Sequence, residues 1–211
     1  MIHGNPHRPM LLDKYLEQNN LKLDYDLDYL ADGADGQTFI IQNEERRVLK
    51  LSVIFDWNNN LLKDFKNVSD TLNNLINIGD PNFAKVFTYK VLGTFYRSLF
   101  NYERQNYVLY FYTMQKLNKL SDDEKKVFHT ILSHEDKNLK KDFSDEKIDE
   151  TLHMLSYGLD FDAKGVKLLC DGLKKSKIQH NDLHERNIMK DDNGRYLMVD
   201  FDRCHIKKGK T

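Results

Sequence analysis

The residues best suited to chemistry lie in two short stretches near the carboxyl end of the chain, 180–189 and 198–202. Asp182, Asn187 and Asp200 each carry a side-chain oxygen, the ligand type that Mg²⁺ prefers. A carboxylate can also accept a proton from a reacting hydroxyl. Asn187 follows Asp182 by five positions, and Asp200 follows Asn187 by thirteen. The alternative is a plain connection between a helix and a hairpin, with Asp and Asn as turn residues.

The first stretch contains His-Asn-Asp-Leu-His-Glu-Arg-Asn, and the second contains Asp-Phe-Asp. Together they resemble the catalytic loop and the metal-binding motif of the protein-kinase-like fold. The form His-x-Asp-Leu-His-x-x-Asn is most similar to atypical kinases and to small-molecule phosphotransferases of the aminoglycoside-phosphotransferase type. The resemblance implies that Asp182 is the catalytic base, that Asn187 and Asp200 bind Mg²⁺, and that His180 braces the loop. It also implies ATP as the phosphoryl donor, because transfer of the γ-phosphoryl group depends mainly on positioning and charge compensation.

The same resemblance gives roles to residues in the first half of the chain. Gly33 and Gly36 lie between two expected strands, where the family has its glycine-rich loop. Glycine there lets backbone N–H groups approach the phosphates of ATP closely. Lys50, in an expected third strand, resembles the family's catalytic lysine, which pairs with the α- and β-phosphates. A hairpin turn and an outward-facing strand lysine are the alternatives, and Asp32 and Asp35 would repel a polyphosphate.

The family's lysine has a glutamate partner on the helix that follows. The helix expected here, 59–78, contains no Glu, so Asp70 is the best substitute as a partner of Lys50, with Asp64 second. Both could equally be solvated helix residues.

The resemblance also implies an adenine-binding hinge at the end of the first half. Met114 falls at the gatekeeper position, and backbone groups from Gln115 to Leu117 are expected to hydrogen-bond to adenine. An ordinary strand end is the alternative.

Two differently built halves must position these residues. Alternating and β-branched segments predict strands in the first half, together with one helix that has apolar residues at helical spacing. The second half is helical, and Ser121 followed by Glu124 forms a capping box that marks a helix start. The turn 191–194 predicts a closing hairpin. The expected strands cover 24–30, 38–41, 47–51 and two or three segments within 83–114; the expected helices cover 9–18, 59–78, the stretch after 121, part of 145–157, and 162–175; the hairpin pairs 187–190 with 195–199.

This order predicts an α+β chain with a bilobal protein-kinase-like fold. Residues 1–114 would form an N-terminal helix and an antiparallel-sheet N-lobe, and residues 115–211 would form a truncated, mainly helical C-lobe. Because only nine residues follow Asp202, the family's activation segment and later helices are expected to be missing. In this respect the chain resembles the minimal kinases found among bacterial effectors and viral proteins. A further hypothesis is that activity appears only when a partner protein completes the C-lobe.

Composition excludes several classes of function. With 40% hydrophobic and 31% charged residues among 211, the chain is typical of a globular protein. The net charge of −1 gives no reason to expect nucleic acid as a partner. No apolar run approaches the ~20 residues of a membrane helix, and no membrane partner is expected. The two cysteines are expected to be reduced thiols, which favours a cytoplasmic location, with delivery into a host cell as a second option.

The expected activity is therefore an ATP- and Mg²⁺-dependent phosphotransferase, first of all a minimal Ser/Thr-type kinase with a protein substrate. Phosphorylation of a small-molecule hydroxyl is an alternative, which His184 and Asp202 favour. A pseudokinase that binds a partner protein is the third hypothesis.

Overall fold

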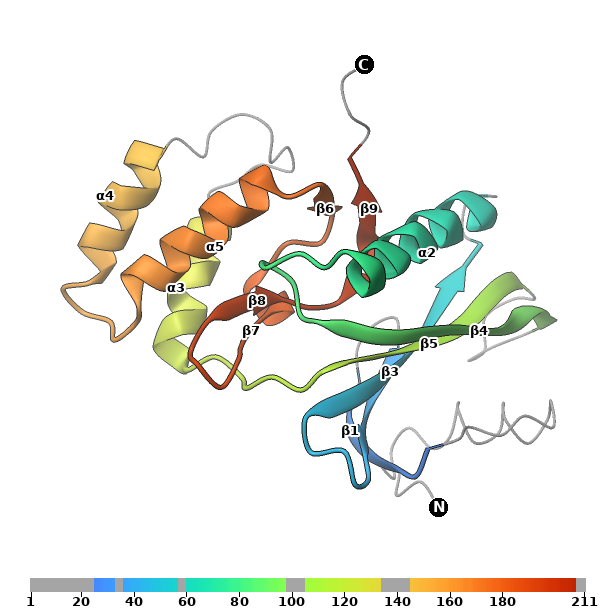
Figure 1. Cartoon of the computed structure of the whole chain (residues 1–211). Helices are drawn as coiled ribbons and strands as arrows, with labels where there is room; N and C mark the ends of the chain where they lie inside the picture. The colour runs from blue at the N-terminus through green and yellow to red at the C-terminus, as the bar shows by residue number, and fades with distance from the viewer. Residues whose placement is uncertain (1–24, 33–35, 57–59, 98–104, 134–144, 208–211) are drawn as a thin grey trace. The chain divides into compact units, whose positions relative to one another are not determined.

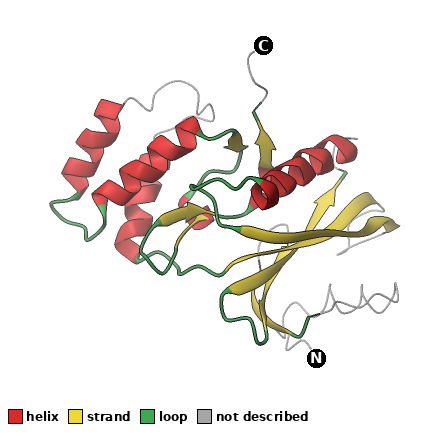
Figure 2. Cartoon of the chain, in the orientation of Figure 1, coloured by secondary structure: helices red, strands yellow, loops and turns green. Residues whose placement is uncertain are grey.

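The computed structural model describes residues 25–32, 36–56, 60–97, 105–133 and 145–207 of the chain (Figures 1 and 2). These residues fall into two compact units. We call Met1–Asn77 with Lys85–Lys116 the N-terminal unit, and Ile78–Ala84 with Leu117–Thr211 the C-terminal unit. The helix expected over 9–18 and the expected loop residue Gly33 lie outside the described residues.

The N-terminal unit is built on a five-stranded antiparallel sheet with the strand order β1-β2-β3-β5-β4. This confirms the α+β class and the antiparallel sheet expected for the first half. The region 83–114 contributes two strands, and the third strand extends four residues beyond its expected end. The strands are β1 (Leu27–Asp32), β2 (Gly36–Ile41), β3 (Arg47–Phe55), β4 (Val86–Arg97) and β5 (Gln105–Gln115).

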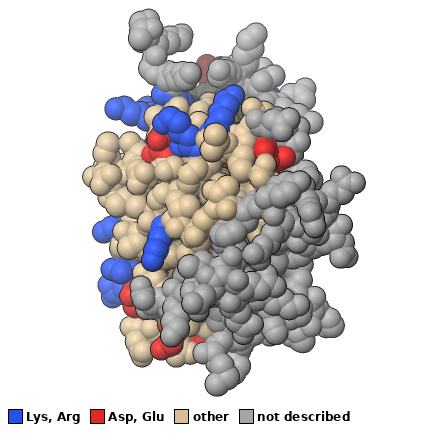
Figure 3. Space-filling model, turned by 90° about the vertical axis from the view of Figure 1, so that its right-hand side faces the viewer, with Lys and Arg blue, Asp and Glu red and all other residues tan. Residues whose placement is uncertain are grey.

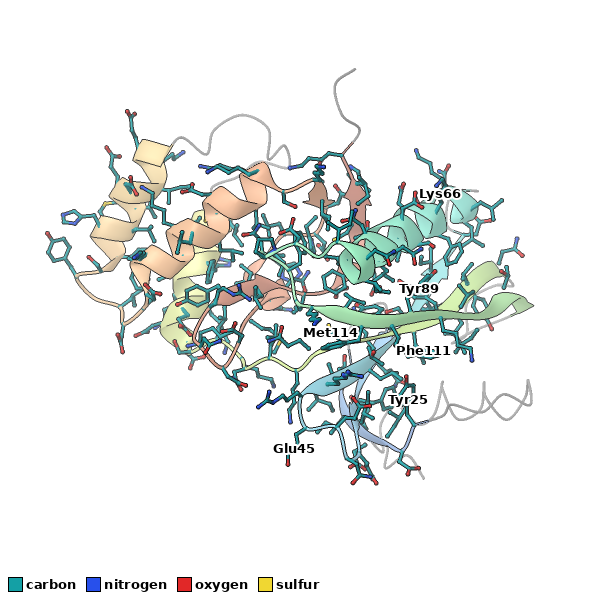
Figure 4. All side chains as sticks on the ribbon, in the orientation of Figure 1. Tyr25, Glu45, Lys66, Tyr89, Phe111 and Met114 are labelled. Carbon is teal, nitrogen blue, oxygen red and sulfur yellow. The ribbon has the colours of Figure 1, made fainter. Side chains whose placement is uncertain are left out.

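The two faces of this sheet bury different partners, because successive side chains of a strand point to opposite faces. One face carries an apolar cluster that includes Leu49, Leu51 and Phe111, and Tyr25 packs edge-on against Phe111 with ring centroids 6.1 Å apart. The opposite face carries the helix α2 (Leu61–Asn77), and Figure 4 shows Tyr89 on this side.

The sequence of α2 explains how the helix lies on the sheet. Its buried residues recur at helical spacing, so they form one stripe along the helix. They are Leu61, Val68, Thr71, Leu72 and Leu75. Phe65 at the edge of this stripe contacts Tyr110 of β5, with ring centroids 6.4 Å apart. Polar residues occupy the outer side of α2, where Lys66 is labelled in Figure 4.

The C-terminal unit begins with three helices and ends with short strands. The helices are α3 (Asp122–Ser133), α4 (Asp145–Leu155) and α5 (Ala163–Lys175). The predicted capping box is confirmed, because the Glu124 N–H donates to Ser121 Oγ at 3.2 Å and the Ser121 N–H donates to Glu124 Oε2 at 2.7 Å. The carboxylate of Glu124 thus helps to fix the start of α3.

Two small antiparallel ladders follow the helices. The predicted hairpin is present as β7 (Ile188–Lys190) paired with β8 (Tyr196–Met198). A second ladder, which the sequence analysis did not predict, pairs β6 (Ile178–His180) with β9 (Cys204–Ile206). Short 3-10 helices η1 (Glu185–Asn187) and η2 (Phe201–Arg203) connect the two ladders.

The segment 78–84 extends the β7–β8 hairpin, although it lies far away in sequence. The Met198 N–H donates to the carbonyl of Asn82 at 2.8 Å, and the Ala84 N–H donates to the carbonyl of Met198 at 2.9 Å. Ser176 Oγ donates to Asp80 Oδ2 at 2.6 Å, which ties the same segment to the end of α5. The segment therefore fixes the strand that leads into Asp200.

Within the described part of the chain, none of the helices has both the length and the apolar composition required to cross a lipid bilayer.

Candidate active site

A closed ring of four hydrogen bonds holds the predicted loop residues of the C-terminal unit. The Asp182 N–H donates to His180 Nδ1 at 3.2 Å, and His180 Nε2 donates to the carbonyl of Val199 at 3.0 Å. The Val199 N–H donates to the carbonyl of Asn187 at 2.8 Å, and Asn187 Nδ2 donates to the carbonyl of Asp182 at 2.9 Å. Since Val199 precedes Asp200, the ring brings together the three positions that the sequence analysis assigned to catalysis and metal binding.

His180 is the hub of this ring and remains neutral. Its Nδ1 accepts a backbone N–H, so the single proton of the neutral imidazole sits on Nε2, where it bonds to Val199. Burial lowers the pKa of His180, although its bond to the Val199 carbonyl and the nearby charges of Asp200 and Asp182 act in the opposite direction. This geometry is consistent with the bracing role expected for His180.

Asn187 is held so that its amide oxygen remains available. The residue is only 6% exposed, and its Nδ2 donates to the Asp182 carbonyl and lies 3.1 Å from His184 Nε2. Because a carbonyl oxygen can only accept a hydrogen bond, the amide atom that faces the Asp182 carbonyl must be Nδ2. The amide oxygen Oδ1 therefore points in another direction. The donor set therefore fits Mg²⁺, which commonly takes one or two protein oxygens and completes its shell with water and phosphate oxygens.

Asp200 has an uncommon backbone conformation. Its φ of 64° and ψ of 83° are left-handed, and its side chain makes no capping bond to η2. Such a conformation costs about 1–3 kcal/mol in a residue other than glycine, and conformations of this kind concentrate at functional sites. Among the described residues, Asn43 in the β2–β3 turn is the other non-glycine residue with positive φ. The strain at Asp200 directs attention to the function of its carboxylate.

The carboxylate of Asp182 is half-exposed, with 39% of its side chain accessible. Its polar contact is His184 Nε2, 3.6 Å from Asp182 Oδ2. A carboxylate with few internal partners, on a loop that the ring fixes, can accept a proton from a hydroxyl that approaches from solvent.

In the N-terminal unit, Lys50 is buried on the sheet face that carries α2. It is 6% exposed and pairs with Tyr112 in the β3–β5 ladder. Val48 and Met114 form the next pair along the same face, because residues two apart in a strand share a face. The outward-facing alternative for Lys50 is therefore wrong, and the lysine, Val48 and the predicted gatekeeper Met114 line one surface.

Gly36 lies in β2, paired with Ser52, instead of in the loop before the strand. A Cβ atom at this position would overlap the carbonyl oxygen of Leu51, so close approach of two strands is sufficient reason for glycine there. Contact of Gly36 with phosphate stays a prediction.

Asp70 forms an ion pair with Lys66 at 2.7 Å and lies on an exposed side of α2. With 3.6 residues per turn, Asp70 lies nearly opposite the buried stripe of α2, whereas Asp64 shares the side of Val68. The pairing of Asp70 with Lys50 stays a prediction, and Asp64, although it is nearer to the buried stripe, is exposed as well.

The predicted hinge leaves one donor for adenine. The Gln115 N–H donates to the carbonyl of Lys85 at 2.8 Å, and the Lys116 N–H donates to the carbonyl of Arg46 at 2.9 Å. Within the described residues, the N–H of Leu117 has no such acceptor. Hydrogen bonding of the hinge to adenine stays a prediction, and the N–H groups of Gln115 and Lys116 already have acceptors within the protein.

Two features of the site were missed by sequence reasoning. The strained backbone of Asp200 had no sequence signal, because Asp is tolerated in many conformations. The position of His184, two residues after Asp182, was noted only as a family variation and not as a site residue. Its role as the N-cap of η1 could not be expected from residue type, since His is not a preferred N-cap residue.

Comparisons with known proteins leave the family of the chain open. No protein-family model matches the chain, and no curated protein matches it. Over the described residues there is also no group of three or more His, Cys, Asp or Glu residues arranged to hold a metal ion. A structural zinc or calcium site is therefore not supported there, whereas a magnesium site that relies on an amide, a carboxylate and phosphate oxygens does not require such a group. On the face drawn in Figure 3, basic and acidic side chains both occur and neither sign covers the surface.

Proposed function

We propose that the protein is an ATP- and Mg²⁺-dependent phosphotransferase of the protein-kinase-like type. The observation that carries the proposal is the closed hydrogen-bond ring of His180, Val199, Asn187 and Asp182, which fixes an acid, an amide and the approach to a second acid. Four matched residues at two matched spacings could arise in an ordinary turn. A partly buried network that orders the same residues around one neutral histidine is harder to attribute to a turn alone.

In this proposal, Asp182 accepts the proton of the attacking hydroxyl. The hydroxyl oxygen forms a bond to the γ-phosphorus, the bond from that phosphorus to the β–γ bridging oxygen breaks, and ADP leaves. Asn187 Oδ1 and the carboxylate of Asp200 would hold Mg²⁺, which neutralises charge on the phosphates when it is bound. The strained backbone of Asp200 supports this role, because folding alone would favour glycine at that position.

Lys50 is proposed to anchor the α- and β-phosphates of ATP. Its place in β3, which matches the position of the family's catalytic lysine, supports this role. Val48 and Met114, which are buried on the same sheet face as Lys50, are proposed to contact the adenine ring. Labelling with an acyl-phosphate derivative of ATP tests this part directly, because a lysine beside the phosphates is acylated. Peptide mapping should find Lys50 labelled and excess Mg²⁺-ATP should protect it.

The proposed acceptor is a Ser or Thr hydroxyl of a protein. A small-molecule hydroxyl is the second acceptor class, and nucleotide binding without transfer, as in a pseudokinase, is the third outcome. The decisive experiment is incubation with γ-labelled ATP and Mg²⁺, alone and with cell lysate. Label on a polypeptide supports the first class, label on a small metabolite supports the second, and label nowhere contradicts phosphotransfer.

Nucleotide binding is tested separately from transfer. A ligand that binds only the folded state adds about 2.7 kcal/mol of stability at one hundred times its dissociation constant. Mg²⁺-ATP should therefore raise the melting temperature, and the Asp200→Ala variant should lose the Mg²⁺-dependent part of that rise. No rise in melting temperature at millimolar Mg²⁺-ATP would contradict both enzyme hypotheses.

A further inference from the structure

Lys207 binds the carboxyl end of α5, although it lies 31 to 34 positions further along the chain than the groups it contacts. Its Nζ donates to the Ser176 carbonyl at 2.7 Å, and the carbonyls of Leu173 and Lys174 lie 3.5 and 3.4 Å from the same nitrogen. The last carbonyl groups of a helix have no partner inside the helix and form the negative end of its dipole. Because an ammonium group carries three hydrogens and a positive charge, Lys207 is well suited to cap this end of α5.

The same lysine directly follows β9, which pairs with β6 beside the end of α5 (Figure 1). The ladder has three residue pairs, and short two-stranded ladders are marginally stable by themselves. The Lys207 N–H donates to the carbonyl of Lys177 at 2.7 Å and so continues the ladder. Ser176 Oγ accepts the Ile178 N–H at 2.9 Å and donates to Asp80, which holds the start of β6. These bonds fasten one end of the β6–β9 ladder to α5.

The other end of the ladder leads into the loop of the candidate active site. His180, the hub of the hydrogen-bond ring, is the last residue of β6 and pairs with the buried Cys204. The Asn181 N–H donates to the carbonyl of Arg203 at 3.1 Å. The next residue is Asp182, whose own N–H donates to His180 Nδ1. The position of β9 therefore bears on the position of the proposed catalytic base.

We propose that Lys207 is a positioning residue for the catalytic loop: its bonds to the end of α5 hold β9 against β6 and thereby fix the place of Asp182. Without them, β9 separates from β6, and the Asn181 N–H loses its acceptor on Arg203. Asp182 is then free to move, and catalysis is sensitive to small displacements of a reacting group. The catalytic consequence rests on the proposed function, whereas the hydrogen bonds do not.

Substitutions of Lys207 test the role of its hydrogens and charge. Lys207→Met removes both and is expected to lower kcat for phosphate transfer by about 10- to 100-fold, with KM for ATP retained. Lys207→Arg keeps the donors and the charge and should retain most of kcat. Lys207→Gln keeps amide hydrogens but no charge; it should lie between the two, and it replaces Lys207→Met should that variant not fold. Lys175→Met removes a charge from an exposed side chain in the last turn of α5 and should have wild-type kinetics.

An unchanged kcat in Lys207→Met, with only the melting temperature lowered, would overturn the proposal, because Lys207 would then stabilise the fold without positioning the loop. Equal losses of kcat in Lys207→Arg and Lys207→Met would also overturn it, since the donors and the charge would not be the features that matter. A rise in KM for ATP at constant kcat would place Lys207 in nucleotide binding and would overturn it as well.

Hydrogen exchange of backbone amides needs no turnover and separates failure of this role from failure of the proposed function. In Lys207→Met, the N–H groups of Asn181 and Asp182 should exchange about 2- to 30-fold faster, as loss of a cation at the carboxyl end of a helix implies. The Met198 N–H, which donates to the Asn82 carbonyl, should exchange at the wild-type rate. Unchanged exchange at Asn181 and Asp182 would overturn the positioning role. If exchange responds but the wild type transfers no phosphate, the coupling of Lys207 to the loop stands and the phosphotransfer proposal fails.

Discussion

The C-terminal unit contains two polar clusters whose carboxylates differ in how many hydrogen bonds they accept. Glu124 is 6% exposed in its side chain and accepts from Lys190 Nζ at 2.8 Å, from the Tyr196 hydroxyl at 2.7 Å and from the Ser121 N–H. In the loop ring, backbone groups, an imidazole and an amide make the hydrogen bonds. Within the part of the chain that the structure describes, the polar contact of the Asp182 carboxylate is the one to His184 Nε2, at 3.6 Å.

The pKa values of Glu124 and Tyr196 reflect the hydrogen bonds that the Glu124 carboxylate accepts. Burial alone would raise the pKa of Glu124, but its bonds to Lys190, Tyr196 and Ser121 bring that pKa below its usual value. Burial and the bond to Glu124 raise the pKa of Tyr196. A carboxylate that is buried and accepts three hydrogen bonds in this way stabilises the fold. The comparison therefore distinguishes a structural acid, Glu124, from an acid that remains available, Asp182.

The largest expected effect is on the rate of phosphate transfer, which should depend on Asp182 and not on Glu124. Asp182→Asn removes the proposed base and should lower the rate of phosphate transfer by about 10²- to 10⁴-fold, while Mg²⁺-ATP binding and the melting temperature stay close to those of the wild type. Steady-state kinetics and nucleotide titration measure both. Asp192→Asn is the control for removal of a negative charge. Turnover of Asp182→Asn within twofold of the wild type would end the assignment.

The second effect is on stability. Glu124→Gln keeps the shape of the side chain but removes the charge that Lys190 and Tyr196 need, so the free energy of unfolding should fall by about 2–3 kcal/mol. Urea denaturation measures this loss. The folded fraction should transfer phosphate at the wild-type rate, if the wild type does so. A stability close to that of the wild type would show that the comparison between the two clusters is wrong.

The third effect tests the strain at Asp200. Asp200→Gly should raise the free energy of unfolding by about 1 kcal/mol relative to Asp200→Ala, because glycine adopts positive φ without cost. Both variants should lose Mg²⁺-dependent nucleotide binding. Urea denaturation of the two variants measures the difference in stability, and nucleotide titration measures the loss of binding. Equal stability of the two variants would mean that the left-handed backbone carries no strain.

The smallest effect is a pH dependence from His180. Its pKa is lower in the folded protein than in the unfolded chain, so the unfolded chain binds the proton first as the pH falls. Stability is therefore complete above the unfolded pKa of about 6.5 and decreases below it, by less than about 1.4 kcal/mol per pH unit for one proton. His180→Gln should flatten this dependence between pH 5.5 and 7.5. The same slope in the variant would exclude His180 as its source.

Local patterns predicted most of the elements. The capping box at Ser121, the apolar stripe of α2 and the hairpin turn at Gly194, which has a φ of 81°, all depend on residues within a few positions of each other. The β6–β9 ladder and the contact of Asn82 with Met198 were not predicted, because they join short segments that are distant in sequence and have no periodicity.

The candidate site shows the same limit. Spacing and a family resemblance identified Asp182, Asn187 and Asp200, and the hydrogen-bond ring brings these positions together. Spacing could not indicate on which side of α2 Asp70 lies, because that depends on how the helix packs against the sheet. The acceptor, the nucleotide and the role of Lys50 remain predictions.

The segment 78–84 has a practical consequence for dissecting the protein. It supplies backbone partners for both the N–H and the carbonyl of Met198, although it belongs to an earlier part of the chain than the rest of its unit. A fragment that begins at 117 would expose those two groups and lose the bond from Ser176 to Asp80. Autonomous folding of this region should therefore require that the seven residues be supplied, for example by fusing them ahead of residue 117 or adding them as a synthetic peptide.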